Sequence, residues 1–301
     1  MRLILNKSNL IARHSQKTCL ENRQSTAHIA QSIASHLATS WQSSFHMHTQ
    51  PFRRPVPIKA RPTDLFNLLA QQEVFKLRIL TRAVRFTTDL SPNGLILQDE
   101  HAINLPDCGL IHDSSRIAGV YSRRNVLELD FNPYDHRLDF APPAQGLATI
   151  EKLFGTDPID ESVLEKERAS RCPAFIPCDC CREAATNRRT HAIHHPLTTI
   201  LATSPDLHIT IRSQSFIYSR PHEAKRVTAV SGWILAVSQE DAVIKIDAGF
   251  LHAICIGIQK LDGETRATMR TYDMLGKDVV ELSSPHLHEV ERWRSIFQAA
   301  T

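Results

Sequence analysis

With 301 residues, of which 42% are hydrophobic, the chain is long enough to bury the cores of one large domain or two ordinary ones. The formal net charge of +3 and the lack of a Lys/Arg-rich run argue against a nucleic-acid partner, and no stretch of about 18 apolar residues is present to span a membrane. Four of the seven cysteines are crowded together rather than spread as a disulfide framework, so we expect a reducing compartment, the cytoplasm.

Residues 1–60 differ in composition from the rest of the chain. They are rich in Arg, Lys, Ser, Gln and His and contain one acidic residue, Glu21. Such an acid-poor leader is typical of a mitochondrial or plastid transit peptide, which makes organelle targeting the alternative to a cytoplasmic location. A disordered tail, or an upstream extension of the reading frame with Met47 as the true start, explains the same composition. Under either interpretation we expect residues 1–60 to lie outside the fold.

Residues 62–155 contain the elements of a first module. Asp64 is suited to cap a short helix with an apolar face, and Phe75–Ile79 alternates apolar with basic residues, which predicts a strand. Further short strands follow, the last of them at Val126–Phe131. A helix around Leu147–Phe154 closes the module.

One polar stretch of this module contains the residue types of an acid–base site. Asp130, Asp135 and Asp139 lie close in sequence to His136, as acid–base chemistry would require. Pro133 and the surrounding polarity instead favour a solvated loop, and we adopt that interpretation.

A linker, residues 156–197, separates the first module from a second one at residues 198–301. Leu207–Ile211 again alternates as a strand, and Val227–Ser238 predicts a pair of strands around a glycine turn. More short strands follow. A terminal helix around Trp293 ends the chain.

The two halves align with one another. Leu68–Phe86 matches Ile200–Tyr218 without a gap, at an offset of 132 residues. Further blocks match in the same order: Gly94–Leu97 with Gly232–Leu235, His101–Leu105 with Asp241–Ile246, Gly109–His112 with Gly249–His252, Asn125–Leu129 with Asp278–Leu282, and the helical stripe Leu147, Ile150 and Phe154 with Val290, Trp293 and Phe297. We therefore predict an α+β fold of two similar antiparallel-sheet modules with flanking helices, produced by internal duplication.

The second module resembles a known family. Val230–Val237, Ala242–Ile246 and Ala253–Ile256 follow the strand, turn and strand order of the haem-utilisation proteins of the HemS/ChuX type, and Asp262–Lys277 is similar to the most specific hairpin of that family. The first module resembles it more remotely. The resemblance implies an extended antiparallel sheet with flanking helices and haem between two duplicated halves. Members of the family carry haem in the cytoplasm, and some degrade it.

The resemblance also implies an axial histidine ahead of the first helix of the second half. The corresponding segment here, Thr186–Thr190, cannot be matched residue by residue and runs on into a histidine cluster. A haem site needs an axial donor, cations for the propionates and apolar faces for the macrocycle. The candidates for these three roles are His191, His194 and His195, then Arg188, Arg189 and Arg212, then Phe250 and Tyr272.

The linker holds a second candidate site. Thiolate and imidazole are the ligands that zinc prefers, and Cys172, Cys178, Cys180 and Cys181 precede the histidine cluster. Their C-x5-C-x-C-C spacing is not that of a standard zinc motif, so a linker with unliganded cysteines is the other interpretation.

The sequence thus gives two hypotheses of different classes. In the first, a soluble protein binds haem or a related tetrapyrrole in the cleft between its modules. Degradation of haem would need a reductant, and no flavin or nicotinamide motif is present, so binding is favoured over catalysis. In the second, a non-enzymatic interaction scaffold has a zinc-stabilised Cys/His linker and purely structural sheets. A homodimer is compatible with both.

Overall fold

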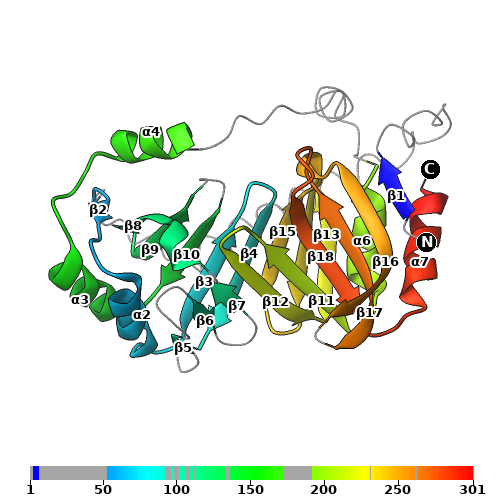
Figure 1. Ribbon diagram of the computed structural model, residues 1–301, viewed down its shortest axis with the longest axis horizontal. Helices are drawn as coiled ribbons and strands as arrows, with labels where there is room; N and C mark the ends of the chain where they lie inside the picture. The colour runs from blue at the N-terminus through cyan, green and yellow to red at the C-terminus, as the bar shows by residue number, and fades with distance from the viewer. Residues whose placement is uncertain are drawn as a thin grey trace, which may run out of the picture. The chain divides into compact units, whose positions relative to one another are not determined.

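The computed structural model describes residues 3–6, 53–91, 96–97, 102–105, 109–111, 113–132, 136–171, 192–230, 232–261 and 263–300. The helices among them are α2 (Pro62–Ala70), α3 (Ala144–Phe154), α4 (Glu161–Arg171), α6 (His194–Thr203) and α7 (Glu289–Ala299), with two short 3₁₀ turns, η4 (Ser114–Arg116) and η5 (Ala248–Phe250). Figure 1 shows how these elements follow one another.

The strands form two nine-stranded antiparallel sheets. Sheet B consists, in spatial order, of β2 (Val56–Pro57), β8 (Ile117–Arg123), β9 (Val126–Phe131), β10 (Arg137–Ala141), β3 (Phe75–Leu80), β4 (Val84–Leu90), β15 (Val243–Asp247), β14 (Trp233–Ser238) and β13 (Ala224–Val230). Sheet A consists of β1 (Leu3–Asn6), β16 (Ala253–Leu261), β17 (Glu264–Tyr272), β18 (Asp278–Ser284), β11 (Leu207–Arg212), β12 (Phe216–His222), β7 (Gly109–Ile111), β6 (Ile103–Leu105) and β5 (Ile96–Leu97).

Both modules have the same topology. The order β8-β9-β10-β3-β4 of the first module recurs as β16-β17-β18-β11-β12 in the second. In each module the remaining three strands form a ladder that continues the sheet of the other module: β15-β14-β13 extends sheet B beyond β4, and β7-β6-β5 extends sheet A beyond β12. The α+β class and the internal duplication predicted from the sequence are therefore confirmed.

Equivalent residues meet where the two modules join. Strand β4 pairs with β15, and its equivalent β12 pairs with β7. Phe86 on β4 and Tyr218 on β12 occupy matching positions at the 132-residue offset, and their ring centroids lie 5.2 Å apart. Residues related by the repeat can touch each other only near a two-fold axis. The modules are thus related by an approximate two-fold rotation through this contact.

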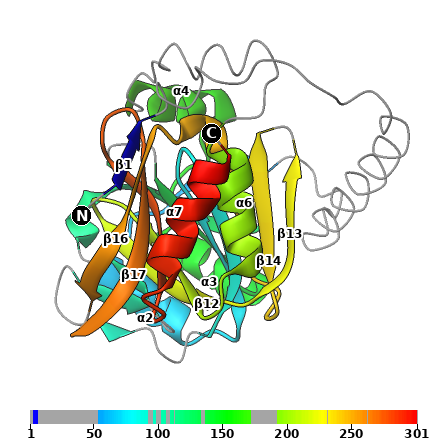
Figure 2. The ribbon, with the colours of Figure 1, turned by 90° about the vertical axis from the view of Figure 1, so that its right-hand side faces the viewer.

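The apolar periodicity of the sequence determines which side of each element is buried. On β3 the buried residues are Phe75, Leu77 and Ile79, which alternate with partly exposed basic residues. On α7 the buried stripe includes Val290, Trp293 and Phe297, as the helical spacing predicts. Helices α6 and α7 lie side by side, α6 against β13 and β14 and α7 against β16 and β17 (Figure 2). The cores of both modules form one continuous apolar cluster.

The sequence alignment of the middle strands was wrong by one strand. Pairing with β4 and β12 makes β7 the equivalent of β15, whereas the sequence alignment matched Gly109–His112 with Gly249–His252. In the same way β9 corresponds to β17, and not to the Asp278–Leu282 strand β18. For the ladder strands the reason is length: β5, β6 and β7 are two or three residues long, and their counterparts have five to seven. Such short strands carry too little periodicity to fix a register.

Two pieces of the N-terminal segment belong to the sheets. Leu3–Asn6 pairs with β16 as the edge strand β1, and Val56–Pro57 pairs with β8 as β2. For these residues the expectation that residues 1–60 lie outside the fold is corrected. The open edges of β8 and β16 explain the difference, because their backbone donors and acceptors take up any extended segment that reaches them.

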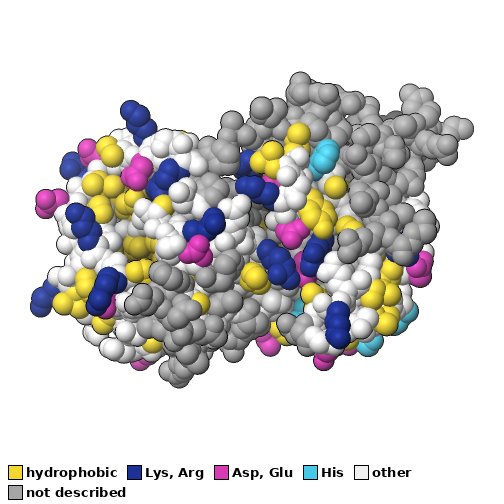
Figure 3. Space-filling model, viewed as in Figure 1, with side chains coloured by type: hydrophobic (Ala, Val, Ile, Leu, Met, Phe, Trp, Pro, Cys, Tyr) yellow, Lys and Arg dark blue, Asp and Glu magenta, His cyan; other side chains and the backbone are white. Residues whose placement is uncertain are grey.

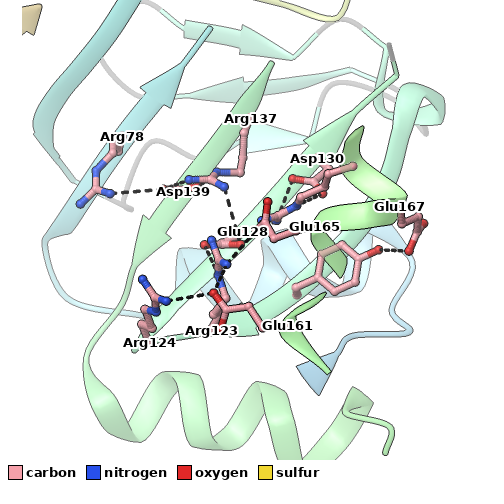
Figure 4. A network of polar contacts seen from close by, with 12 residues as sticks. Arg78, Arg123, Arg124, Glu128, Asp130, Arg137, Asp139, Glu161, Glu165 and Glu167 are labelled. Atoms are coloured by element: carbon pink, nitrogen blue, oxygen red, sulfur yellow. Dashed lines mark hydrogen bonds and ion pairs between the residues drawn. The ribbon is translucent and has the colours of Figure 1, made fainter. Parts of the chain in front are cut away.

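The linker, residues 156–197, also contains structure that the sequence analysis did not predict. Helix α4 occupies Glu161–Arg171, and α6 begins inside the segment at His194. The polar α4 is held by charge: Arg168 is 1% exposed, and its guanidinium donates to Asp130 Oδ2 at 2.9 Å and to Glu128 Oε2 at 2.7 Å. Asp130 and Glu128 point from β9 toward α4 (Figure 4).

Neighbouring charges complete this network. Arg137 and Asp139 on β10 form an ion pair at 2.6 Å, and Arg123 bridges Glu128 to Glu161 of α4. Asp130 and Asp139 are both buried, so the prediction that they lie in a solvated loop is wrong. They occupy regular strand positions, and α4 and the adjacent arginines replace the water that the prediction assumed.

The charged groups respond to burial in different ways. Burial raises the pKa of Asp139 to about 6, an increase that Arg137 only partly opposes. Burial also raises the pKa of Asp130 despite its bonds to Arg168. Glu128 is the exception: burial favours its neutral form, but Arg137, Arg168 and Arg123 together lower its pKa.

Candidate functional site

A pocket of about 440 Å³ lies where the two modules join. Both modules contribute to its lining, which consists of Thr81, Arg82, Ala83, His136, Arg212, Ser213, Gln214, Ile217, Phe250, Asp273, Lys277, Asp278 and Val279. Its volume is within the range of about 300–1,000 Å³ that small-molecule and cofactor sites occupy.

Two equivalent hairpin turns form opposite parts of the lining. Thr81 N–H donates to Val84 O at 2.8 Å, and Val84 N–H donates back to Thr81 Oγ1 at 3.0 Å. At the 132-residue offset Ser213 and Phe216 repeat both bonds, at 2.8 and 3.0 Å. Each hydroxyl thus closes a tight turn at its own strand end. The pocket is therefore bordered by the same hydrogen-bonded turn from each module.

Two carboxylates shape the remaining walls. Asp273 Oδ1 accepts the backbone N–H groups of Leu275 and Lys277 at 2.8 and 2.9 Å, which orders the β17–β18 turn at the pocket edge. Asp247 Oδ1 accepts Gly249 N–H at 2.9 Å and so caps η5, the turn that places Phe250 in the lining.

A polar cluster adjoins the pocket on the outer face of sheet A. Arg212 Nη2 donates to Glu281 Oε1 at 3.2 Å, and Arg270 donates to the other oxygen of the same carboxylate. Glu281 is 2% exposed, while the two arginines are about a quarter exposed at 28% and 25%. Tyr272 lies beside Arg270, and burial, with the nearby charge of Asp278, raises the pKa of its phenol.

The lining contains apolar, imidazole and cationic groups together with two carboxylates, Asp273 and Asp278. Phe250, Ile217 and Val279 provide apolar surface, and His136 provides an imidazole. Arg82, Arg212 and Lys277 supply positive charge. A flat apolar molecule that carries carboxylates and a coordinating metal needs these three types of group together. The residues present therefore fit a metallo-tetrapyrrole.

The structure places the predicted site residues in different surroundings. Arg212 and Phe250 line the pocket, and Tyr272 belongs to the adjoining polar cluster. His194 is buried in the first turn of α6, with its Nε2 3.2 Å from Trp233 O, and His195 is exposed. The candidates outside the described residues are His191, Arg188, Arg189, Cys172, Cys178, Cys180 and Cys181. Within the described ranges no group of three His, Cys, Asp or Glu side chains is placed to hold a metal ion.

Sequence reasoning missed the role of three lining residues, His136, Arg82 and Lys277. His136 was assigned to a solvated loop, although its ring packs at 6.0 Å from the ring of Phe216 in the other module. For Arg82 the sequence offered one clue. At the 132-residue offset Arg82 corresponds to Gln214, so the repeat places both residues in equivalent turns. Only the contact between modules brings the three together.

Comparison with known proteins rests on structure alone. No family model matches the sequence, and no curated protein matches it. ChuS, a heme oxygenase from Escherichia coli, is 10% identical over 82% of this chain and 89% of its own, with a TM-score of 0.57. Holo-PhuS, a heme-binding protein from Pseudomonas aeruginosa, is 9% identical over 82% of this chain and 86% of its own, with a TM-score of 0.58.

These values define the class of fold. The chain has the duplicated α+β fold of ChuS and PhuS, and the resemblance to the HemS/ChuX type is confirmed at the level of the fold. In the part of the chain that the structure describes, no helix is long and apolar enough to cross a membrane.

Proposed function

We propose that the chain binds haem or a related tetrapyrrole in the pocket between its modules and handles it in the cytoplasm. The observation that carries the proposal is the meeting of an apolar wall, three cations and a histidine in one pocket. The fold shared with a heme oxygenase and a heme-binding protein supports it, because both neighbours act on the same class of molecule.

Each group in the pocket has a distinct role in this proposal. Phe250, Ile217 and Val279 exclude water from the faces of the macrocycle, and Arg82, Arg212 and Lys277 bind its propionates. The imidazole of His136 would hold the haem iron within the pocket. Bound haem would supply the redox chemistry of its iron, while the protein supplies the ligand, the charge and the apolar wall.

The histidines that precede or begin α6 give a second source of the axial ligand. His194 is held against Trp233 O, so His191 and His195 are the members of that cluster to test. Zinc bound by the four linker cysteines belongs to the rival scaffold hypothesis, in which the pocket has no ligand.

Hemin titration monitored by the Soret band tests the proposal. We expect saturable binding with one hemin per chain, at least tenfold weaker binding and an altered Soret band in His136→Ala, and weaker binding in Arg212→Gln. Exposed Arg226 on β13 gives the matched control Arg226→Gln, which should bind as the unaltered protein does. Loss of binding in the double variant His191→Ala/His195→Ala with normal binding in His136→Ala would move the axial ligand to the linker.

Two further results separate the remaining alternatives. Stoichiometric zinc by elemental analysis with no hemin response would overturn the proposal in favour of the scaffold. Addition of ascorbate and oxygen to the hemin complex tests degradation: loss of the Soret band would add this activity to binding.

A further inference from the structure

A second group of cations lies on strands β4, β15 and β14 of sheet B, outside the lining of the pocket. Lys245 Nζ is 4.5 Å from the centroid of the Trp233 ring, and Arg85 Cζ is 5.5 Å from it. Lys245 and Arg85 are directly opposite each other in the strand register, so their side chains leave the sheet on the same face. None of the three residues lines the pocket.

This pair differs from the other cations of the sheets. Most of those have a carboxylate partner, as in Lys76–Asp89 at 3.1 Å, Arg123–Glu128 at 3.0 Å and Lys225–Asp241 at 2.8 Å. On the face drawn in Figure 3, cationic and acidic side chains are interspersed accordingly. Among the described residues, by contrast, neither Arg85 nor Lys245 forms an ion pair with a carboxylate; the acid that interacts with both is Asp247, two residues along β15, whose Oδ1 already accepts Gly249 N–H.

The arrangement is unfavourable in the absence of a ligand. Like charges directly opposite on neighbouring strands destabilise a sheet. Burial and the charge of Arg85 both lower the pKa of Lys245, and Asp247 offsets this only in part. A local conflict of this kind marks a functional site more often than a structural one.

We propose that Arg85, Lys245 and Trp233 form a binding site for a phosphate-type dianion, either inorganic phosphate or a small phosphomonoester. Two adjacent cations that form no ion pair with a described carboxylate match the two negative charges of a dianion, whereas a monocarboxylate carries only one. A guanidinium binds phosphate oxygens in a bidentate manner, and an ammonium adds a point charge. The indole holds both cations in place before the anion arrives, which limits the ordering cost of binding.

The fluorescence of the Trp233 indole can be used to measure binding. In a Trp41→Phe background, two tryptophans remain: Trp233 at the site, and Trp293, which is fully buried with its Nε1–H donated to Ser204 Oγ at 2.9 Å. Withdrawal of the two cations toward an anion changes the emission of Trp233 and leaves that of Trp293 unchanged. Inorganic phosphate, glycerol 3-phosphate and acetate are titrated separately at constant ionic strength.

We expect saturable changes with the two phosphates and none with acetate, and the tighter of the two identifies the source of the ligand. Arg85→Gln and Lys245→Gln should each weaken binding at least tenfold. The matched control is Lys225→Gln, which alters a paired cation on the neighbouring strand β13 and should bind normally. Equal responses to acetate, or unchanged phosphate binding in Arg85→Gln, would overturn the site. So would loss of hemin binding in Lys245→Gln, since the cations would then serve the tetrapyrrole.

Discussion

The outer faces of the two modules carry charges at corresponding positions and use them differently. In the strand register, Asp139 on β10 lies opposite Arg78 on β3, and Glu281 on β18 lies opposite Thr210 on β11. Because Arg78 and Thr210 are 132 residues apart, Asp139 and Glu281 occupy equivalent positions. In the first module α4 covers this face and inserts Arg168 between two more carboxylates. In the second, Glu281 holds two partly exposed arginines beside the pocket.

The difference shows how the same fold can bury its charges in one copy and leave them accessible to a ligand in the other. A buried acid that is enclosed by arginines on all sides can anchor a helix, but it offers nothing to a ligand. An acid that orients arginines still in contact with water leaves their remaining donors available. The covering helix, more than the sheet itself, separates the two outcomes.

The largest loss of stability is expected from removing Arg168 from the buried charge network between α4 and β9. Arg168→Met leaves Glu128 and Asp130 buried without their main partner, which should lower the free energy of unfolding by about 3–5 kcal/mol. Denaturant unfolding measures the loss. Arg124, which is 60% exposed and pairs with Glu161, gives the control Arg124→Met with an expected change of at most about 1 kcal/mol. Equal effects of the two variants would contradict the comparison.

A second test uses pH. The pKa of Asp139 is raised from 3.8 to about 6 in the folded state, so the folded protein binds this proton more tightly than the unfolded chain does. Its contribution to stability is therefore complete below about pH 4 and is lost as pH rises through 6. Relative to Asp139→Asn, the unaltered protein should lose up to about 3 kcal/mol across that window. Parallel pH profiles of the two proteins would show that Asp139 is not perturbed.

A smaller loss is expected at the equivalent acid of the second module. Glu281→Gln weakens the bonds to Arg212 and Arg270, but both arginines still reach water, so unfolding should become easier by about 1–2 kcal/mol. Glu264→Gln, in an exposed pair with Arg266, is the control and should change little. A loss of stability as large as that of Arg168→Met would mean that the outer face of the second module is also shielded from water.

The smallest effects test the symmetry directly. Thr81→Ala and Ser213→Ala each remove the hydroxyl that closes one of the two equivalent turns, and each should cost about 0.5–1.5 kcal/mol. Thr81→Ser and Ser213→Thr keep the hydroxyl and should preserve stability in the same unfolding assay. Clearly unequal costs for the two alanine variants would show that the turns are equivalent in geometry alone.

The sequence was informative where long elements alternate regularly. Phe75–Leu80 and Leu207–Arg212 align at one offset because each needs every second residue in the core, and that constraint survives duplication. The stripes on α3 and α7 persist for the same reason. The short strands β5 to β7 have no such constraint, so their correspondence became visible only from backbone pairing.

The site was less predictable, since its residues meet only in space. Arg212 and Phe250 were selected for their side-chain chemistry, whereas His136 and Lys277 lie in turns whose sequences read as ordinary surface. Likewise, nothing in the pattern of β9 reveals that Glu128 and Asp130 will be covered by Arg168 from a polar helix 38 and 40 residues away. Periodicity gives the face of a strand, but it does not say what covers that face.

The exchanged three-stranded ladders have a consequence for the origin of the chain. A protein with a single module would expose the edge of β4 or β12, and its own ladder would have no sheet to extend. Two copies of such a protein could form a two-fold symmetric dimer in which the ladder of each copy pairs with the exposed strand edge of the other. Fusion of the two genes would keep this exchange of ladders and make it independent of protein concentration. Each copy could then diverge in sequence independently of the other.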